Sequence, residues 1–365
     1  MKTLFLGDVS PTKDTYALYA AGKTDLLFGD TKELFAGKDI TMVNLECAIT
    51  DAEQGIDKFG PCIKAPVQTA AVLKELGAKY VCLSNNHFFD FGKKGVMDSK
   101  AALDAAGLTY TGFGENEEDA RRDLVIEKDG ERIAVICVCE HEYSYALEDR
   151  MGSRAFDEFQ TMLDIRRAKE EGADRVIVTY HGGKEQCEYP SPRLRKACRA
   201  MIEHGADMVL TQHSHCVGCY EEYKGGHILY GQGNYQFVFL TDPDMPENWH
   251  DGLAVEYDTK TGEIAFTPYT EGTDGGVHLA KGAEYDRIMS AFAKRNAELQ
   301  NGEWKAGWHA FCETKAPHYT RVVMRAYGPE QSDRRNHNFA HYLDCEAHLD
   351  VWREIFPTAN QTNEK

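Results

Sequence analysis

Polar side chains that can bind a metal ion or move a proton follow an apolar run near residue 80. Residues 80–83 have the sequence YVCL, an apolar run typical of a buried strand. Asn85, Asn86 and His87 follow this run. A carboxamide oxygen can coordinate a hard cation, and an imidazole beside it can move a proton near neutral pH. Because ligands of open α/β proteins bind where strands end, this loop is predicted to line a functional site.

Side chains of the same kinds stand at the ends of four other predicted strands, near residues 6, 43, 179 and 210. Together with Asn86, the candidate metal ligands are Asp8, Glu46, His181, His213 and His215. Two carboxylates, a carboxamide and three imidazoles suit Zn, Mn or Fe better than Ca or Mg. Six ligands exceed the four of one tetrahedral zinc, so the set predicts two divalent metal ions that share a carboxylate. Each residue alone has an ordinary explanation as a turn or loop residue, and only their joint arrangement favours a metal site.

The two histidines of the motif HSH, His213 and His215, are two positions apart in the sequence. On one strand such side chains point to the same face, and we expect each imidazole to reach a different metal ion. His87, beside the predicted ligand Asn86, is then a candidate general acid. A dinuclear centre lowers the pKa of a bridging water and neutralises charge that develops on the substrate, so the predicted chemistry is hydrolysis.

The composition is that of an ordinary globular protein, with 365 residues, 42% hydrophobic and 27% charged. This length suffices for one large domain with an appendage, or for two domains. The net charge of −18 argues against nucleic acid or an anionic membrane surface as a partner. An anionic substrate, whether small molecule or polymer, would need local positive charge, which bound metal supplies.

Eleven cysteines are present, and Cys82, Cys137 and Cys139 lie in strand-like runs. We expect buried free thiols, as in a reducing compartment, and therefore a cytoplasmic protein. The first eight residues are too short and too soon polar for a secretory signal, and no apolar run approaches the ~20 residues of a membrane helix. The pair Cys216 and Cys219 could bind zinc or act in redox chemistry, but one such pair is more often two ordinary thiols.

Strand and helix signals alternate along the first three quarters of the chain. Helices are expected over 66–77, 96–106, 159–172 and 191–205, and hairpins are expected to turn near residues 129 and 261. This order predicts a mixed sheet, or two stacked sheets, with helices outside. We expect a core domain over residues 1–275, a C-terminal helical extension over 276–357 and a disordered tail over 358–365.

The order of these motifs resembles the CapA family of poly-γ-glutamate capsule-biosynthesis proteins, within the calcineurin-like metallophosphoesterase fold. The resemblance covers about residues 1–270 and does not include the helical extension. The runs that carry it are GDV at 7–9, NLE at 44–46, SNNHFFDFG at 84–92, HGGKE at 181–185, HSH at 213–215 and YGQGNY at 230–235.

The resemblance implies a four-layer α/β/β/α sandwich and a role for each matching residue. Asp8 would bind one metal ion and Glu46 would bridge both; Asn86, His181 and His213 would bind the second ion, His215 would return to the first, and His87 would be catalytic. Residues expected to orient these groups or to contact substrate are Ser10, Asn85, Asp90, Glu185 and Asn234. Two positions depart from the usual pattern, because Ser10 replaces a histidine ligand and Gly182 stands where a tryptophan is usual. One ion would therefore be held more weakly or be completed by water.

These inferences predict a metal-dependent hydrolase of the phosphoesterase type. A metal-activated water would attack a phosphoester or a γ-glutamyl amide, in the metabolism of poly-γ-glutamate or another capsule polymer. One alternative is a non-catalytic capsule-synthesis component that binds polyglutamate through metal. A second alternative is a structural α/β domain with a vestigial site.

Overall fold

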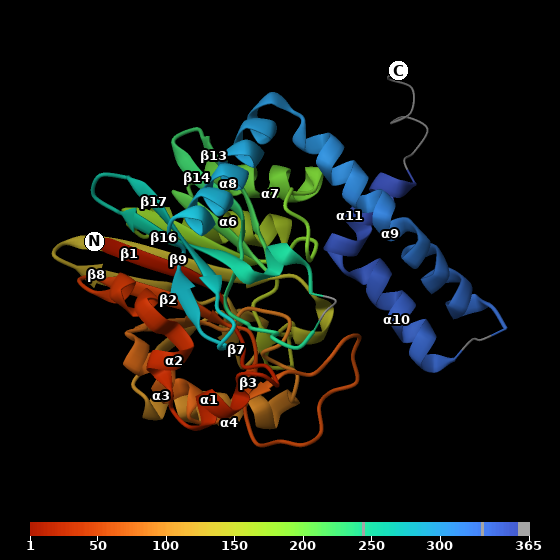
Figure 1. The fold of residues 1–365 in the computed structure, drawn as a ribbon, viewed down its shortest axis with the longest axis horizontal. Coiled ribbons are helices and arrows are strands. Elements are labelled where there is room, and N and C mark those ends of the chain that lie inside the picture. The colour runs from red at the N-terminus through yellow and green to blue at the C-terminus, as the bar shows by residue number, and fades with distance from the viewer. Residues whose placement is uncertain (243–244, 330–331, 357–365) are drawn as a thin grey trace.

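Two β-sheets lie face to face in the computed structural model, which describes residues 1–242, 245–329 and 332–356 (Figure 1). The predicted disordered tail, 358–365, lies outside the described residues. The larger sheet has the strand order β18-β17-β16-β1-β2-β5-β6, and β15 also pairs with β1. Its strands are β1 (Lys2–Val9), β2 (Ile40–Leu45), β5 (Tyr80–Cys82), β6 (Thr109–Thr111), β15 (Asn234–Gln236), β16 (Asp251–Asp258), β17 (Ile264–Glu271) and β18 (Val277–Leu279).

The smaller of these two sheets has the order β13-β14-β12-β11-β9-β8. Its strands are β8 (Leu124–Lys128), β9 (Glu131–Cys139), β11 (Arg175–His181), β12 (Met208–Gln212), β13 (Val217–Tyr223) and β14 (Gly226–Gln232). β8 and β9 form the hairpin predicted near residue 129, where Asp129 and Gly130 both have positive φ. Two further sheets have two strands each and pair β3 (Ala48–Ile49) with β4 (Lys64–Ala65) and β7 (Phe113–Gly114) with β10 (Gly152–Ser153).

The four helices predicted from sequence are present as α3, α4, α6 and α7. α4 (Gly92–Ala105) begins before the predicted start at residue 96. α3 (Thr69–Leu76) is followed by Gly77, whose φ of 107° is accessible because glycine has no Cβ. Ser191 caps α7 by accepting a hydrogen bond from the amide of Leu194. The α-helices are α1 (Tyr16–Ala20), α2 (Thr24–Phe28), α3 (Thr69–Leu76), α4 (Gly92–Ala105), α5 (Glu117–Ala120), α6 (Glu158–Glu170), α7 (Pro192–Glu203), α8 (Ala283–Asn301), α9 (Trp304–Tyr327), α10 (Asp333–Asp344) and α11 (Glu346–Ile355), with 3-10 turns η1 (Gly29–Phe35), η2 (Glu142–Ser144) and η3 (Glu247–His250).

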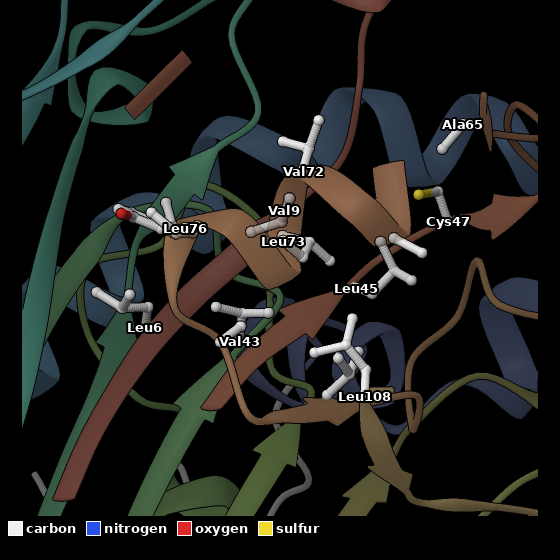
Figure 2. Close-up of a cluster of buried hydrophobic side chains, with 14 of the residues drawn as sticks. Leu6, Val9, Val43, Leu45, Cys47, Ala65, Val72, Leu73, Leu76 and Leu108 are labelled. Atoms are coloured by element: carbon white, nitrogen blue, oxygen red, sulfur yellow. The ribbon is translucent and has the colours of Figure 1, made fainter. Parts of the chain in front are cut away.

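Three apolar cores separate four layers. The inner faces of the two sheets meet in one core, which joins Phe5 and Met42 of the larger sheet to Val135 of the smaller one. The outer face of the larger sheet packs on α2 and α3, and Figure 2 shows Val43 and Leu45 of β2 close to Leu73 of α3. The outer face of the smaller sheet packs on α6, α7 and α9. The predicted α/β/β/α sandwich is therefore confirmed.

Alternation along β9 explains how one strand serves two of these cores. Ile133, Val135 and Cys137 face the other sheet, whereas Ile136 and Val138 face the helices. Side chains of a strand alternate between its two faces, so a continuous apolar run marks a strand that is buried on both sides. The prediction of buried free thiols also holds, since Cys82, Cys137 and Cys139 are all buried and unpaired.

The C-terminal helices begin later than the sequence pattern indicated. β18 pairs with β17 as an edge strand of the larger sheet, so the helical segment starts at Ala283 and not near residue 276. α9, α10 and α11 lie at one end of the molecule, coloured blue in Figure 1. Trp304 and Trp308 are buried in the core that α7 also contributes to, as expected of packing anchors. Within the described residues, no helix combines the length and apolar character needed to cross a bilayer.

Candidate metal centre

The ends of parallel strands from both sheets meet at one place, and the six predicted ligands lie there. The residues of this cluster, here called the floor, are Asp8 in β1, Glu46 after β2, Asn86 after β5, His181 at the end of β11, and His213 and His215 after β12. Ligand atoms of Glu46, His181 and His213 lie within 4.8 Å of one another, and so do those of Asp8, Glu46 and His215. Glu46 belongs to both groups, which is the position that a bridging carboxylate requires.

His181 and His215 flank the two carboxylates at distances suited to a shared cation. Nε2 of His181 is 3.3 Å from Oε1 of Glu46 and 2.8 Å from Oδ1 of Asn86. Nε2 of His215 is 3.8 Å from the same Glu46 oxygen, and its Nδ1 is 3.6 Å from Oδ2 of Asp8. Nitrogen and oxygen atoms bound to one zinc ion stand about 3.4 Å apart, so a metal ion fits among these groups.

Glu46 provides a direct test of whether this cluster suits a cation. The side chain is completely buried, and within the described residues neither of its oxygens accepts a hydrogen bond. A buried carboxylate without hydrogen bonds costs several kcal/mol unless a positive charge compensates it. The residues therefore fit divalent metal ions, which would occupy the free lone pairs of Glu46.

Charge acts in opposite directions on two histidines of the floor. Burial lowers the pKa of His181, but the carboxylates of Glu46 and Asp8 outweigh burial and raise it to about 10. Burial and the neighbouring His141 and His181 instead hold the pKa of His213 well below its usual value. Burial also raises the pKa of Asp8, but hydrogen bonding and charge from His181 outweigh it and lower that pKa. A cation that binds here therefore competes with a proton on His181 but not on His213.

The expectation that His213 and His215 share one strand face is wrong. β12 ends at Gln212, and the two histidines lie beyond it with φ values of 77° and 55°. This left-handed region is strained for residues with a Cβ. Both imidazoles reach the cluster because the loop turns back on itself, and Asp8 holds the turn by accepting a hydrogen bond from the His213 amide at 3.1 Å.

Asn44 is a site residue that the sequence reasoning did not single out. Its Nδ2 donates to Oδ1 of Asp8 at 2.7 Å and lies 3.0 Å from Nδ1 of His181. Its Oδ1 accepts a hydrogen bond from Nδ2 of Asn85 at 3.0 Å. Asn44 thus orients a carboxylate and an imidazole at once. Its signals in the sequence were its place two residues before Glu46 and its membership of the NLE run at 44–46.

Asn85 shapes the loop that presents Asn86 and His87. Its Oδ1 accepts hydrogen bonds from the amides of His87 and Phe88, at 3.1 and 2.9 Å. Its Nδ2 also donates to the carbonyl of Leu45 at 2.8 Å. The side chain therefore ties the loop after β5 to the end of β2 and is buried under the ligands.

His87 is held by a buried carboxylate on its own loop. Its Nδ1 lies 2.7 Å from Oδ2 of Asp90, which is completely buried. Lys58 forms an ion pair with the other oxygen of Asp90 and lies 3.2 Å from Nδ1 of His87. With Nδ1 engaged by Asp90, Nε2 is the nitrogen of His87 that remains for chemistry.

The other three predicted orienting residues occupy different places. Oδ1 of Asn234 lies 2.9 Å from Nδ1 of His215, and this contact fixes the orientation of the His215 ring. Glu185 is half-exposed, with an oxygen 3.9 Å from Nε2 of His213, so it borders the cluster. Ser10 is buried and adjoins the thiol of Cys47, so it supplies no imidazole where a histidine is usual.

Gly182, the other departure from the usual pattern, is explained by close packing. A Cβ at this position would lie 2.8 Å from the Glu140 carboxyl carbon and 2.8 Å from the ring of Tyr180. Glu140 also accepts hydrogen bonds from Tyr180 and from the amide of Gly183. Glu140 therefore supports the loop after His181.

The motifs that contribute residues to this site lie in a segment that matches a known protein family. The family described as "Bacterial capsule synthesis protein PGA_cap" matches residues 2–239. The chain belongs to this family. The resemblance predicted from the motifs is thus confirmed, and the match ends before α8 begins.

Two named proteins from Bacillus species are similar in sequence to this chain. Capsule biosynthesis protein CapA of Bacillus anthracis is 32% identical over 240 residues, which cover 64% of this chain and 58% of the relative. PGA biosynthesis protein CapA of Bacillus subtilis is 26% identical over 279 residues, which cover 72% and 70%. The chain thus spans little more than half the length of the first relative.

Solved structures are more distant. The calcineurin-like phosphoesterase YfkN from Bacillus subtilis is 14% identical, with a TM-score of 0.42, over 82% of this chain and 94% of that one. The NAD nucleotidase NadN of Haemophilus influenzae is 13% identical, with a TM-score of 0.43, over 84% of this chain and 60% of that one. These likenesses are too weak to carry an argument about the site.

A cavity of about 250 Å³ opens above the floor. Asn86, His87 and His213 line one side of it. The opposite side, here called the wall, comes from α10 and α11 and consists of His341, Tyr342, Ala347 and His348. The sequence reasoning placed these helices in a separate extension and did not assign them to the site. Two cations, Lys58 and Lys184, also line the cavity.

Proposed function

We propose that this protein is a metal-dependent hydrolase that acts on an anionic substrate in capsule-polymer metabolism. The observation that carries the proposal is the fully buried Glu46, which has no hydrogen-bond partner among the described residues and adjoins two histidines of the floor. The bond cleaved would be a phosphoester or a γ-glutamyl amide. The names of the Bacillus relatives, which refer to capsule and PGA biosynthesis, support the polymer context.

The floor residues would hold two divalent ions, of Mn, Fe or Zn. Asp8, Glu46 and His215 would surround one ion, and Glu46, Asn86, His181 and His213 would surround the other. When bound, such ions lower the pKa of a water and neutralise charge that develops on the substrate. Asn44 and Asn234 keep the ligand side chains in place.

His87 would hold and move a proton at Nε2. Asp90 fixes the ring by its contact with Nδ1, so the tautomer that donates from Nδ1 leaves Nε2 as an acceptor toward the cavity. In its protonated form, the same nitrogen can donate to the oxygen or nitrogen that leaves when the substrate bond breaks. Because Asp90 and His87 are both buried, this pair stays aligned without help from solvent.

Lys184 and the metal ions would draw an anionic group into the cavity. The whole chain carries a net charge of −18, so an anion meets repulsion except where positive groups gather. Lys184 and the metal ions would provide such a place, whereas the charge of Lys58 is shared with Asp90 beside His87. A phosphate or a glutamyl carboxylate carries the matching charge.

The proposal is tested by turnover of purified protein loaded with Mn, Fe or Zn. Generic phosphomonoesters, phosphodiesters and γ-glutamyl amides are assayed before and after chelation, with wild type compared with His87→Asn. We expect turnover that is lost on chelation and reduced by about 10²–10⁴-fold in His87→Asn, with metal content unchanged. Turnover that survives both treatments, or its absence with all metals and substrates, would overturn the proposal.

Ser10 favours one alternative, a protein that binds a polymer through metal without cutting it. With serine in place of histidine, an ion beside Asp8 would have three protein ligands, Asp8, Glu46 and His215, and would be held more loosely. Binding of poly-γ-glutamate is measured with metal-loaded and chelated protein. Metal-dependent binding without turnover would select this alternative, and binding unchanged by chelation would exclude it.

A further inference from the structure

A second set of metal-binding side chains lies beside the floor and is used by none of the chemistry above. Ligand atoms of His141, His341 and Cys345 lie within 4.8 Å of one another, and all three side chains are buried. His141 follows β9 in the core, whereas His341 lies in α10 and Cys345 separates α10 from α11. We propose that these three residues bind a third divalent cation, of the zinc class, which fastens the helical wall to the core.

The distance between the donor atoms of His141 and Cys345 matches that of two ligands of a tetrahedral zinc ion. Nδ1 of His141 is 3.5 Å from Sγ of Cys345. Zinc bonds of ~2.05 Å to nitrogen and ~2.3 Å to sulfur, at a tetrahedral angle, put these atoms about 3.6 Å apart. One thiolate and two imidazoles are also the ligand types that favour zinc over Mg or Ca.

His341 is oriented as a metal ligand would be. Its Nδ1 lies 2.8 Å from Oε1 of Glu142, so Nε2 is the nitrogen left for a cation. Histidines that bind zinc commonly donate their other ring N–H to a carboxylate, which fixes the ring and increases its basicity. Glu142 occupies that place in η2, one residue after His141.

A cation can reach this cluster, and a fourth coordination position would remain. His141 and His341 both line the 250 Å³ cavity, so the cluster adjoins open space. Three protein ligands with a position left for water are typical of zinc sites that are not closed on all sides. His141 also has a φ of 89°, a left-handed conformation that persists where surrounding contacts impose it.

The position of this cluster connects it to the floor. Nε2 of His141 lies 2.8 Å from Nε2 of His213, while Nδ1 of His141 faces Cys345. With ions bound at both the floor and this cluster, through Nδ1 of each ring, His213 and His141 would each carry a hydrogen on Nε2. The two rings would then move apart, which couples the two sites. A cation at this cluster would also hold α10 and α11 over the cavity, because two of its three ligands come from the segment that forms the wall.

Cobalt substitution tests the proposal without relying on activity. The floor residues include no cysteine, and among the clusters of three or more possible ligand side chains in the described residues only this one contains a cysteine. A thiolate-to-cobalt charge-transfer band in the near ultraviolet is therefore expected from this cluster, and its loss in Cys345→Ala assigns it. Wild type, loaded with Co²⁺ to saturation, is expected to show the band. Cys345→Ala should lose it together with one equivalent of cobalt, whereas Cys312→Ala, which removes another buried thiol of the C-terminal helices, should keep both.

A second variant guards against misfolding of Cys345→Ala. His341→Gln keeps the thiol and removes one imidazole, so the band should shift or weaken and cobalt at this cluster should bind at least about tenfold less tightly. Circular dichroism checks that each variant retains its helices. Cobalt-loaded wild type without the band, a band that persists in folded Cys345→Ala, or His341→Gln with unchanged spectrum and affinity would each overturn the proposal.

Discussion

The floor and the wall of the cavity use the same side chain, histidine, in opposite electrostatic settings. On the floor, two buried carboxylates outweigh burial and raise the pKa of His181 to about 10. On the wall, burial and the nearby Lys184 hold the pKa of His348 well below its usual value. Burial together with neighbouring positive groups lowers the pKa of a histidine, both at His348 and at the floor residue His213. The pair Asp8 and Glu46 reverses this at His181 and makes the floor attract cations.

Glu46→Gln should have the largest effect on the electrostatic difference between floor and wall. The substitution removes the negative charge that the two ligand groups of the floor share. We expect affinity for both floor ions to fall by more than about 100-fold and turnover to be lost with them. Elemental analysis and metal titration measure the effect. Glu75→Gln on the exposed face of α3 is the control, and normal metal content in Glu46→Gln would refute the bridging role.

Asp90→Asn should separate positioning from metal binding on the floor side of the cavity. The amide cannot hold His87 in the same tautomer, so we expect turnover to fall by about 100-fold or more while metal content stays normal. The pH profile of turnover should shift as well, which a purely structural change would not produce. Asp57→Asn, at an exposed position beside Lys58, should leave both unchanged.

The affinity of the floor for metal should depend on pH because of the raised pKa of His181. Since His181 in the metal-free fold has a pKa raised to about 10, it carries a proton between about pH 7 and about pH 9, and a floor metal must displace that proton. Affinity is therefore expected to rise by about tenfold per pH unit over this range. Calorimetric titration of chelated protein in buffers of different ionisation enthalpy measures the proton released, and a flat affinity would contradict the assignment.

The same proton affects the stability of the metal-free fold, with the opposite dependence on pH. A raised folded-state pKa contributes stability that is fully present below the unfolded value of 6.5 and is lost as pH rises through about 10. Urea unfolding of chelated protein should therefore show a falling free energy of unfolding across that range.

Tyr342→Phe should have the smallest effect of these substitutions, and it tests whether a change in the wall leaves metal binding at the floor unaffected. Its hydroxyl lies 2.7 Å from Nε2 of His318, and losing this hydrogen bond should cost about 1 kcal/mol of unfolding free energy. Metal content of the floor should not change, because the ring itself remains in place. Loss of floor metal in this variant would mean that the wall and the floor are not separable.

The sequence predicted the residues at strand ends better than it predicted the paths of the loops, for a physical reason. Parallel strands end at a common edge, so polar residues after apolar runs are bound to come together, and Asp8, Glu46 and His181 were placed from that rule. The path of a loop follows no such rule. The left-handed turns at His213 and His215, and the bridging contacts of Asn44, depend on hydrogen bonds between segments far apart in the chain.

The sequence by itself predicted the order of strands and helices and the set of side chains on the floor, because strand periodicity and strand ends are local properties. The order of its motifs indicated the family, and that resemblance implied the layered sandwich. Only the tertiary structure decided that α10 and α11 cover this floor and bring His341 and Cys345 to His141. Helical periodicity indicates which face of a helix is buried but not what that face meets. That contact depends on how the helices pack on the smaller sheet, through a core to which Trp308, Tyr342 and Val351 all contribute.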